Sequence, residues 1–210
     1  EKINRAFTKT GLKVIFYFLQ NEEWINLTYR ELADKTGAAL GNINYILNGL
    51  KETGYLLNAD KNNYKLTNKK ELLQNWMTAY AERLKPTLEI GTFRFLKGED
   101  FENWKGIQLK TDKTRWGGEA AGALLTNYLL PEILTLYTDE ERNELIKHYR
   151  LIPDPQGNVK VYRKFWRYDE VNDNFAPPLL VYADLMNTGD RRCIETAEKI
   201  YNELLRNRFQ

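Results

Sequence analysis

Serine is absent from the 210 residues, while cysteine and histidine occur once each, as Cys193 and His148. A chain without serine has no serine nucleophile, and one cysteine can form neither an internal disulfide nor a thiolate cluster for zinc. One histidine cannot by itself build a histidine-based metal site. We therefore expect a protein of a reducing compartment that needs no metal or cofactor, with Cys193 as a small apolar residue of the core.

Long apolar runs are also lacking. No stretch approaches the roughly 20 consecutive apolar residues of a membrane-spanning helix, and no signal peptide is visible. Charged residues make up 29 % of the sequence and hydrophobic residues 42 %, which is typical of soluble proteins. The sequence therefore predicts a soluble, cytoplasmic protein with buried cores and no membrane partner.

The stretch TYRELADKTGAALGNINYILNGLKETG, residues 28–54, predicts two short helices joined by a tight turn. Thr28 and Glu31 have the spacing of a capping box, so the first helix should run from about residue 29 to residue 36. Gly37 tolerates the left-handed backbone that ends a helix. A second helix, closed by Gly54, is indicated by apolar residues at the helical spacing, namely Ile43, Ile46, Leu47 and Leu50.

The opposite face of this second helix carries small and polar side chains: Gly41, Asn42, Asn44, Tyr45 and Asn48. Asparagine is a mediocre helix former, so its repeated use indicates a role other than helix stability. Its amide can pair with the edge of adenine, and a tyrosine can reach a base or a phosphate. A helix-turn-helix inserts such a second helix into the major groove.

A β-hairpin is expected directly behind this helix, with strands at 55–57 and 64–66, and residues 24–27 can add a third short strand. Lys61 and Lys65 lie near the tip of the hairpin, where they can contact DNA phosphates, and Thr28 and Arg30 are further candidates for phosphate contacts. The stretch resembles the winged helix-turn-helix of bacterial transcriptional regulators through Leu32, Ala33, Gly37, Ile43, Leu47, Leu50, Gly54 and Tyr55. A winged helix used only for protein contacts stays open as an alternative.

Charge is distributed unevenly along the chain. Residues 1–85 hold 13 lysines and arginines against 9 acidic residues, a net charge of +4, and the other 125 residues have a net charge of −2. Because the excess is small, DNA affinity should come from a few placed phosphate contacts, with moderate salt dependence.

Helices are predicted on both sides of the 28–54 stretch. A scaffold helix at 8–20 should pack behind it, and a helix from Asn68 to Lys85, capped by Thr67 and stopped by Pro86, should follow the hairpin. This second helix either links the winged helix to a partner, which is the next domain or a second copy of the chain, or packs only within the chain. A palindromic operator implies paired helix-turn-helix units in a homodimer, although neither this helix nor the C-terminal one has a sustained heptad repeat.

From Leu88 the pattern changes to mixed strands and helices without regular βαβ spacing. This predicts an α+β fold, with a winged helix-turn-helix domain and its linker helix at 1–86 and an α+β domain at 87–210. The expected elements begin with a strand at 88–96 with a bulge near Gly91, a short helix or loop at 101–109 and a buried helix around 120–129. A strand at 133–137 and a helix opened by a Thr138–Glu141 capping box and ending near 149 should follow. The last expected elements are a hairpin formed by 151–152 and 159–166, a helix ending near 187, and a C-terminal helix capped by Asp190.

Two groups of residues in the second half are candidate sites. Arg115, Trp116, Gly117 and Gly118 precede a helix whose free N–H groups can hold an anion, although the lysine and hydroxyl residue of a phosphate loop are missing and tight packing explains the glycines equally well. Asp169, Glu170 and Asp173 crowd one loop without the spacing of an EF-hand, as expected for a solvated acidic loop. No acid/base pair or nucleophile arrangement is visible, so the sequence predicts no catalytic residue and no enzyme.

Three further segments, 116–140, 151–166 and 176–205, together with the winged helix, resemble the AbiE-type antitoxin family of type IV toxin-antitoxin systems, in its transcriptional-regulator branch. The resemblance implies a two-domain antitoxin that binds double-stranded DNA at its own operator and represses its operon. It also implies a C-terminal domain that opposes a nucleotidyltransferase toxin encoded alongside, without a stable complex. Two alternatives stay open: a ligand-responsive winged-helix regulator with a small molecule near Trp116 and Gly117, and an enzyme that acts on nucleic acid or nucleotides through its acidic residues.

Overall fold

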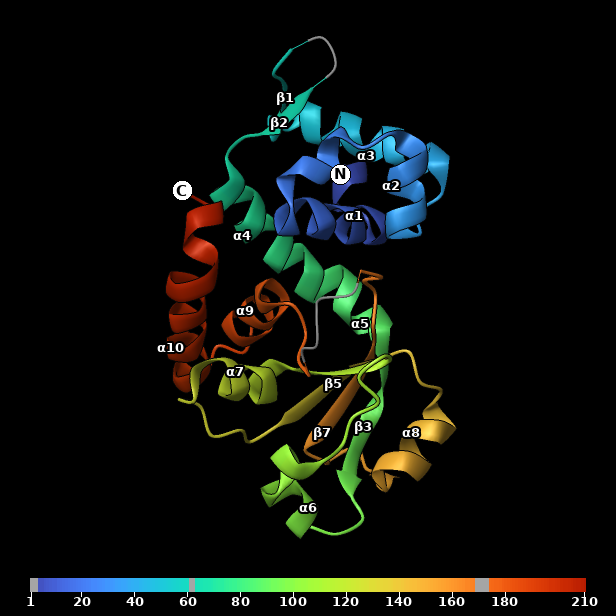
Figure 1. Ribbon diagram of the computed structural model, residues 1–210, viewed down its shortest axis with the longest axis vertical. Helices are drawn as coiled ribbons and strands as arrows, with labels where there is room; N and C mark the ends of the chain where they lie inside the picture. Colours follow the sequence, from blue (N-terminus) through green and yellow to red (C-terminus); the bar gives the residue numbers. More distant parts are fainter. Residues whose placement is uncertain (1–3, 61–62, 169–173) are drawn as a thin grey trace. The chain divides into compact units, whose positions relative to one another are not determined.

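The computed structural model describes residues 4–60, 63–168 and 174–210. Helices and two sheets occur together in the described chain (Figure 1), so the prediction of an α+β fold is confirmed. The chain divides into two compact units. The first consists of Glu1–Thr87, Phe165–Asp169 and Asn207–Gln210, and the second of Leu88–Lys164 and Glu170–Arg206.

The core of the first unit is built between α1 (Lys9–Gln20) and α4 (Lys69–Ala79). Trp76 is fully buried and stacks between Phe16 and Tyr80, with ring centroids 5.4 and 4.9 Å away. Its indole N–H donates to the Leu12 carbonyl at 2.8 Å, so the only polar atom of the side chain is satisfied inside the core.

Helices α2 (Tyr29–Thr36) and α3 (Leu40–Glu52) follow, and then strands β1 (Leu56–Asn58) and β2 (Tyr64–Leu66), which pair antiparallel. The predicted capping box at the start of α2 is present, and Gly37 ends that helix with a φ of +73°. Both helices therefore follow the sequence prediction closely.

The predicted third strand at 24–27 is wrong, because Glu22–Asn26 forms a 3₁₀ turn. The Asn26 side chain takes over the strand's pairing: its amide oxygen accepts from Tyr64 N at 2.7 Å, and its amide nitrogen donates to Tyr64 O at 3.1 Å. A side-chain amide thus replaces a backbone peptide at the edge of the hairpin.

Both ends of the helix that follows the hairpin differ from the prediction. Asn68, not Thr67, is the N-cap of α4, in a left-handed conformation with a φ of +50°. The helix also does not stop at Pro86 but continues through a π-helical turn, Tyr80–Leu84, into α5 (Lys85–Leu88). Proline lacks the N–H that donates within an α-helix, and the π turn, which ends two residues before Pro86, changes the hydrogen-bonding register of the helix.

The second unit contains a five-stranded sheet in the order β4-β5-β7-β3-β6. Its strands are β3 (Glu89–Phe95), β4 (Thr114–Gly117), β5 (Leu134–Thr138), β6 (Leu151–Pro153) and β7 (Val159–Arg163). The β5–β7 pair is parallel and the others are antiparallel. The predicted bulge is confirmed, since the register of β3 with β7 shifts between Glu89 and Gly91.

Strands β6 and β7 do not form the predicted hairpin, because β3 lies between them in the sheet. The connecting segment passes directly over β3: a Cβ added at Gly157 would lie 2.0 Å from the Phe93 carbonyl oxygen. The sequence predicts both strands, but the spatial neighbour of each strand depends on long-range pairing.

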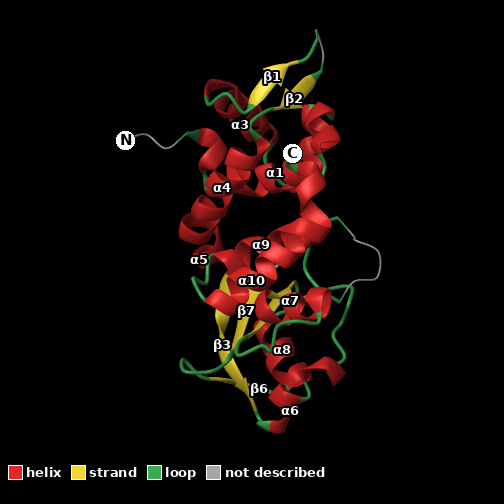
Figure 2. Cartoon of the chain, turned by 90° about the vertical axis from the view of Figure 1, so that its left-hand side faces the viewer, coloured by secondary structure: helices red, strands yellow, loops and turns green. Residues whose placement is uncertain are grey.

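The described helices of the second unit are α6 (Glu99–Glu102), α7 (Gly118–Thr126), α8 (Arg142–Tyr149), α9 (Pro178–Met186) and α10 (Arg191–Ile200), which ends in a π-helical turn at Tyr201–Leu205. Helices α7, α9 and α10 pack on one another, and α7 and α9 contact the sheet at β4 (Figure 2). Leu179, Leu180, Ala197 and Ile200 are buried in this layer. None of the helices in the described ranges is long and apolar enough to span a bilayer.

A buried polar cluster joins β4, β5 and α8. The Glu140 side chain is fully buried, and one of its carboxylate oxygens accepts from Thr114 Oγ1 at 2.5 Å and from the Tyr149 hydroxyl at 2.7 Å. The other lies 3.3 Å from Lys110 Nζ. Burial opposes the charged form, but the hydrogen bonds from Thr114 and Tyr149 and the Lys110 ammonium outweigh it, so the pKa of Glu140 is lowered.

This cluster also explains why the predicted Thr138–Glu141 capping box is wrong. Thr138 is the last residue of β5, and its hydroxyl is bonded to Thr114 Oγ1 and accepts from Glu140 N. The cap of α8 lies three residues later, where Glu141 N donates to the Glu144 carboxylate at 3.3 Å.

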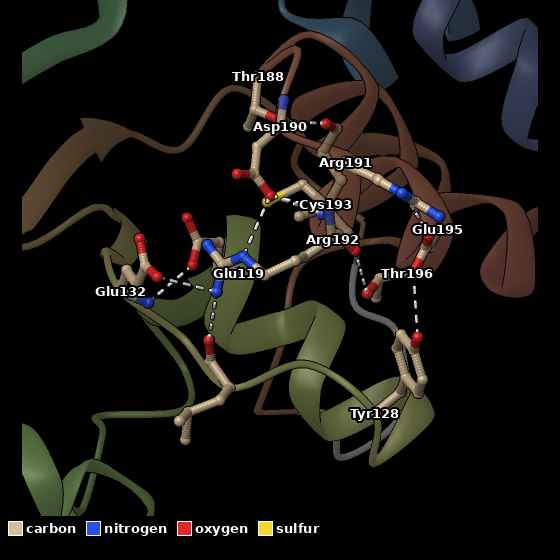
Figure 3. A network of polar contacts seen from close by, with 12 residues as sticks. Glu119, Tyr128, Glu132, Thr188, Asp190, Arg191, Arg192, Cys193, Glu195 and Thr196 are labelled. Atoms are coloured by element: carbon tan, nitrogen blue, oxygen red, sulfur yellow. Dashed lines mark hydrogen bonds and ion pairs between the residues drawn. The ribbon is translucent and has the colours of Figure 1, made fainter.

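The start of α10 is held by a network of polar contacts, shown in Figure 3. Asp190 accepts from the backbone N–H groups of Arg192 and Cys193, as the predicted N-cap should. Arg192 also pairs with Glu132 at 3.1 Å. Cys193 is fully buried, and burial raises the pKa of its thiol to about 11, so the thiol stays protonated at neutral pH and occupies the core as a small residue.

Candidate nucleic-acid interface

Helix α3 separates its two faces as the sequence predicts. Its apolar stripe, Ile43, Ile46, Leu47 and Leu50, is buried in the first unit. The opposite side is exposed along its whole length, including Gly41, Asn42, Asn44, Tyr45 and Asn48. We call these five residues the amide face. Because the stripe fixes the rotation of the helix, the amide face points outward.

Asn44 and Asn48 are oriented by hydrogen bonds on this face. The Asn44 side-chain oxygen accepts from the Tyr29 hydroxyl and from Asn48 Nδ2, each at 3.4 Å. Asn44 therefore presents its amide nitrogen as a donor, and Asn48 presents its oxygen as an acceptor. The adenine edge in the major groove offers the complementary acceptor and donor.

Tyr29 is a part of this surface that sequence reasoning missed. It lies at the start of α2 and is 37 % exposed. Its contact with Asn44 spans the turn between two helices, so it depends on how α2 packs against α3. The periodicity of a single helix carries no signal of that packing.

The β1–β2 hairpin lies next to α3 in the chain and is tied to its last turn. Lys51 Nζ lies 3.0 Å from the Tyr64 hydroxyl and 4.3 Å from the centre of that ring. Lys65, paired across the hairpin with Leu57, is exposed. The structure thus leaves the Lys65 ammonium available to an anion, whereas Lys61 lies outside the described residues.

Thr28 and Arg30, the other predicted phosphate contacts, are both exposed. The Thr28 hydroxyl donates to Glu31 Oε2 at 2.8 Å and accepts from Glu31 N, so its capping role occupies it. Hydrogen bonds from the backbone N–H and the hydroxyl of Thr28 lower the pKa of Glu31. A charged carboxylate beside Thr28 disfavours a phosphate there, which leaves Arg30 as the better placed of the two.

The second predicted site, Arg115 to Gly118, lies inside the fold rather than on a surface. All four residues are buried in β4 and at the start of α7, and Trp116 packs edge-on against Trp104 with centroids 5.2 Å apart. A Cβ at Gly117 would lie 2.6 Å from the Tyr137 ring, and one at Gly118 would lie 2.8 Å from Thr135 Oγ1. Close packing therefore accounts for both glycines, and the anion or small-molecule site stays a prediction without structural support.

The remaining candidates do not form a site in the described part of the chain. Asp169, Glu170 and Asp173 lie outside the described residues. His148 is exposed in the last turn of α8, edge-on to Tyr149 with centroids 4.6 Å apart. Within the described ranges, no three histidine, cysteine or acidic side chains gather closely enough to hold a metal ion.

Comparison with known protein families identifies a match over most of the chain. Residues 65–206 match the family described as a transcriptional regulator, the AbiEi antitoxin of type IV toxin-antitoxin systems. This range contains the three C-terminal segments that carried the sequence resemblance but starts after α3. No curated protein and no solved structure matches the chain.

Proposed function

Because the chain belongs to the AbiEi antitoxin family of transcriptional regulators in type IV toxin-antitoxin systems, we propose that it binds its own operator sequence-specifically and represses its operon. In this proposal, residues 1–86 are a winged helix-turn-helix domain: α2 and α3 form the helix-turn-helix, and the β1–β2 hairpin forms the wing. Residues 87–210 are the antitoxin domain, which opposes a nucleotidyltransferase toxin without a stable complex.

The observation that carries the DNA-binding proposal is the amide face of α3, which is exposed while the apolar stripe behind it is buried. A helix that inserts into the major groove needs side chains that reach base edges from a rigid support. Asn44 and Asn48 supply the amides, and the core beneath α3 supplies the support. Lys65 on the hairpin and Arg30 on α2 provide charges for the flanking phosphates.

The direct test is a binding titration of the full chain against the DNA upstream of its own operon and against scrambled DNA of the same length, at moderate salt. The expected result is clear preference for the upstream DNA, since specific complexes are typically 10³ to 10⁷ times tighter than non-specific ones. Equal affinity for both DNAs would overturn the proposal.

Lys65→Ala is expected to weaken binding to upstream and scrambled DNA by the same factor. The lysine contacts a phosphate in the proposal, and phosphates are the same in every sequence. The slope of log K against log salt should become less negative by about 0.9, the value for one phosphate contact.

Binding titrations at four or five salt concentrations measure this slope. The matched control is Lys147→Ala, which removes an exposed lysine of α8 and should leave the slope unchanged. A change in the preference between the two DNAs would show that Lys65 reads sequence instead.

The antitoxin role is tested separately in cells. If the proposal is right, a nucleotidyltransferase reading frame lies beside the gene, and expression of this chain restores growth to cells that express that protein. Purified together, the two proteins should elute apart on a sizing column. Failure to restore growth would contradict the antitoxin role and leave the DNA-binding proposal standing.

A further inference from the structure

The segment before α1, residues 4–7, is docked against α3. Asn4 Nδ2 donates to the Gly49 carbonyl of α3 at 3.2 Å, and Asn4 Oδ1 accepts from Ala6 N at 2.8 Å, which starts the 3₁₀ turn Arg5–Phe7. Ala6 is fully buried. This short segment is therefore a packed part of the first unit.

Two glycines make this close approach possible. A Cβ at Gly49 would lie 2.3 Å from Asn4 Oδ1, and a Cβ at Gly11 would lie 2.1 Å from the Ala6 carbonyl oxygen. Both glycines lie inside helices, α3 and α1, where glycine is otherwise unfavourable. Contact with the docked segment explains why the two helices carry them.

Docking places Arg5 beside the amide face. Arg5 is exposed, and its guanidinium carbon lies 5.7 Å from the centre of the Tyr45 ring, which is itself 57 % exposed. A guanidinium stacked on an aromatic ring still has its in-plane N–H groups free for an anion, and their fork geometry suits a phosphate. The Tyr45 ring thus holds a cation beside the face that is proposed to enter the groove.

We propose that Arg5, held by the docked segment and by Tyr45, binds a phosphate of the DNA backbone beside the groove entered by α3. This inference rests on the proposed DNA-binding function and extends the interface to the segment before α1. No local sequence pattern indicates this contact, because Arg5 and Tyr45 are forty residues apart and meet only through the packing of Asn4 on α3.

The test compares wild type, Arg5→Ala and Arg5→Lys in binding titrations with upstream and scrambled DNA over a range of salt concentrations. For Arg5→Ala we expect equal weakening on both DNAs and a slope of log K against log salt that is less negative by about 0.9. Arg5→Lys keeps the charge and should retain most of the slope. Lys147→Ala serves as the control for removal of a cation remote in sequence.

Gly49→Ala tests the docking itself. The added methyl group displaces Asn4, while alanine supports the helix. The slope of log K against log salt should therefore become less negative by the same amount as in Arg5→Ala. Adding Arg5→Ala to Gly49→Ala should change the slope little further. Circular dichroism checks that the helix content is unchanged. If Gly49→Ala fails to fold, Asn4→Ala removes the same hydrogen bond from the segment side.

The possible results separate the two proposals. An unchanged slope in Arg5→Ala, with wild-type preference for the upstream DNA intact, overturns the role of Arg5 and leaves the proposed function standing. A wild-type protein without sequence preference overturns both. A change in base preference in Arg5→Ala, without a change in slope, also contradicts a phosphate contact.

Discussion

Trp76→Ala is expected to lower the free energy of unfolding of the first unit by about 3–5 kcal/mol, the usual cost of removing a large buried aromatic side chain. Trp76 is fully buried between Phe16 and Tyr80, so the truncation leaves a cavity and two rings without their stacking partner. It also leaves the Leu12 carbonyl without its indole donor. Chemical denaturation followed by circular dichroism measures the change.

Two variants set the scale for this result. Trp76→Phe keeps an aromatic ring and loses the hydrogen bond, so its cost should be smaller, about 1–3 kcal/mol. Leu57→Ala removes an apolar side chain that is 56 % exposed and should change stability by no more than about 0.5 kcal/mol. If Trp76→Ala were as mild as Leu57→Ala, Trp76 would not form the centre of the core.

Glu140→Ala is expected to destabilise the second unit by about 2–6 kcal/mol, because it leaves two buried hydroxyl groups without their acceptor, at a cost of about 1–3 kcal/mol each. The substitution strips the Thr114 and Tyr149 hydroxyl groups of their acceptor and removes the counter-charge of Lys110. These groups tie β4, β5 and α8 together, so the loss should appear as earlier unfolding of this unit in denaturant.

The same carboxylate predicts a pH dependence. The pKa of Glu140 is lowered in the folded protein, so the unfolded chain binds the proton more readily. The stability it contributes is therefore fully present above the ordinary glutamate pKa of about 4.3 and is lost as the pH falls through the lowered folded value. Glu140→Gln should flatten this loss in denaturation curves recorded between neutral and acid pH. If the stability of Glu140→Gln fell equally steeply at acid pH, the loss would come from other carboxylates.

The sequence predicts the structure correctly where a feature depends only on residues close to it in the chain. The capping box and Gly37 predict the bounds of α2, and the apolar spacing predicts which face of α3 is buried. The bulge predicted near Gly91 is also present in β3. In each case the information lies within a few residues of the feature. Short-range hydrogen bonding and burial of one stripe are enough to produce it.

The sequence predictions failed where the structure of an element depends on a partner far away in the sequence. Asn26 takes the place of a third strand because its side chain forms two hydrogen bonds with the backbone of Tyr64, 38 residues away. The two strands of the predicted 151–166 hairpin, β6 and β7, are separated in the sheet by β3. Tyr29 and Arg5 join the candidate interface only through the packing of other elements on α3, and no periodicity encodes that packing.

The most direct test of the account is the base preference of the amide face. Randomised DNA is selected with wild type, Asn44→Ala and Asn48→Ala, and the bound sequences are compared at each position. The account predicts that each variant loses discrimination at particular base pairs, worth about 1–3 kcal/mol each, and keeps its affinity for scrambled DNA. Identical base preferences in all three proteins would contradict the claim that α3 reads DNA.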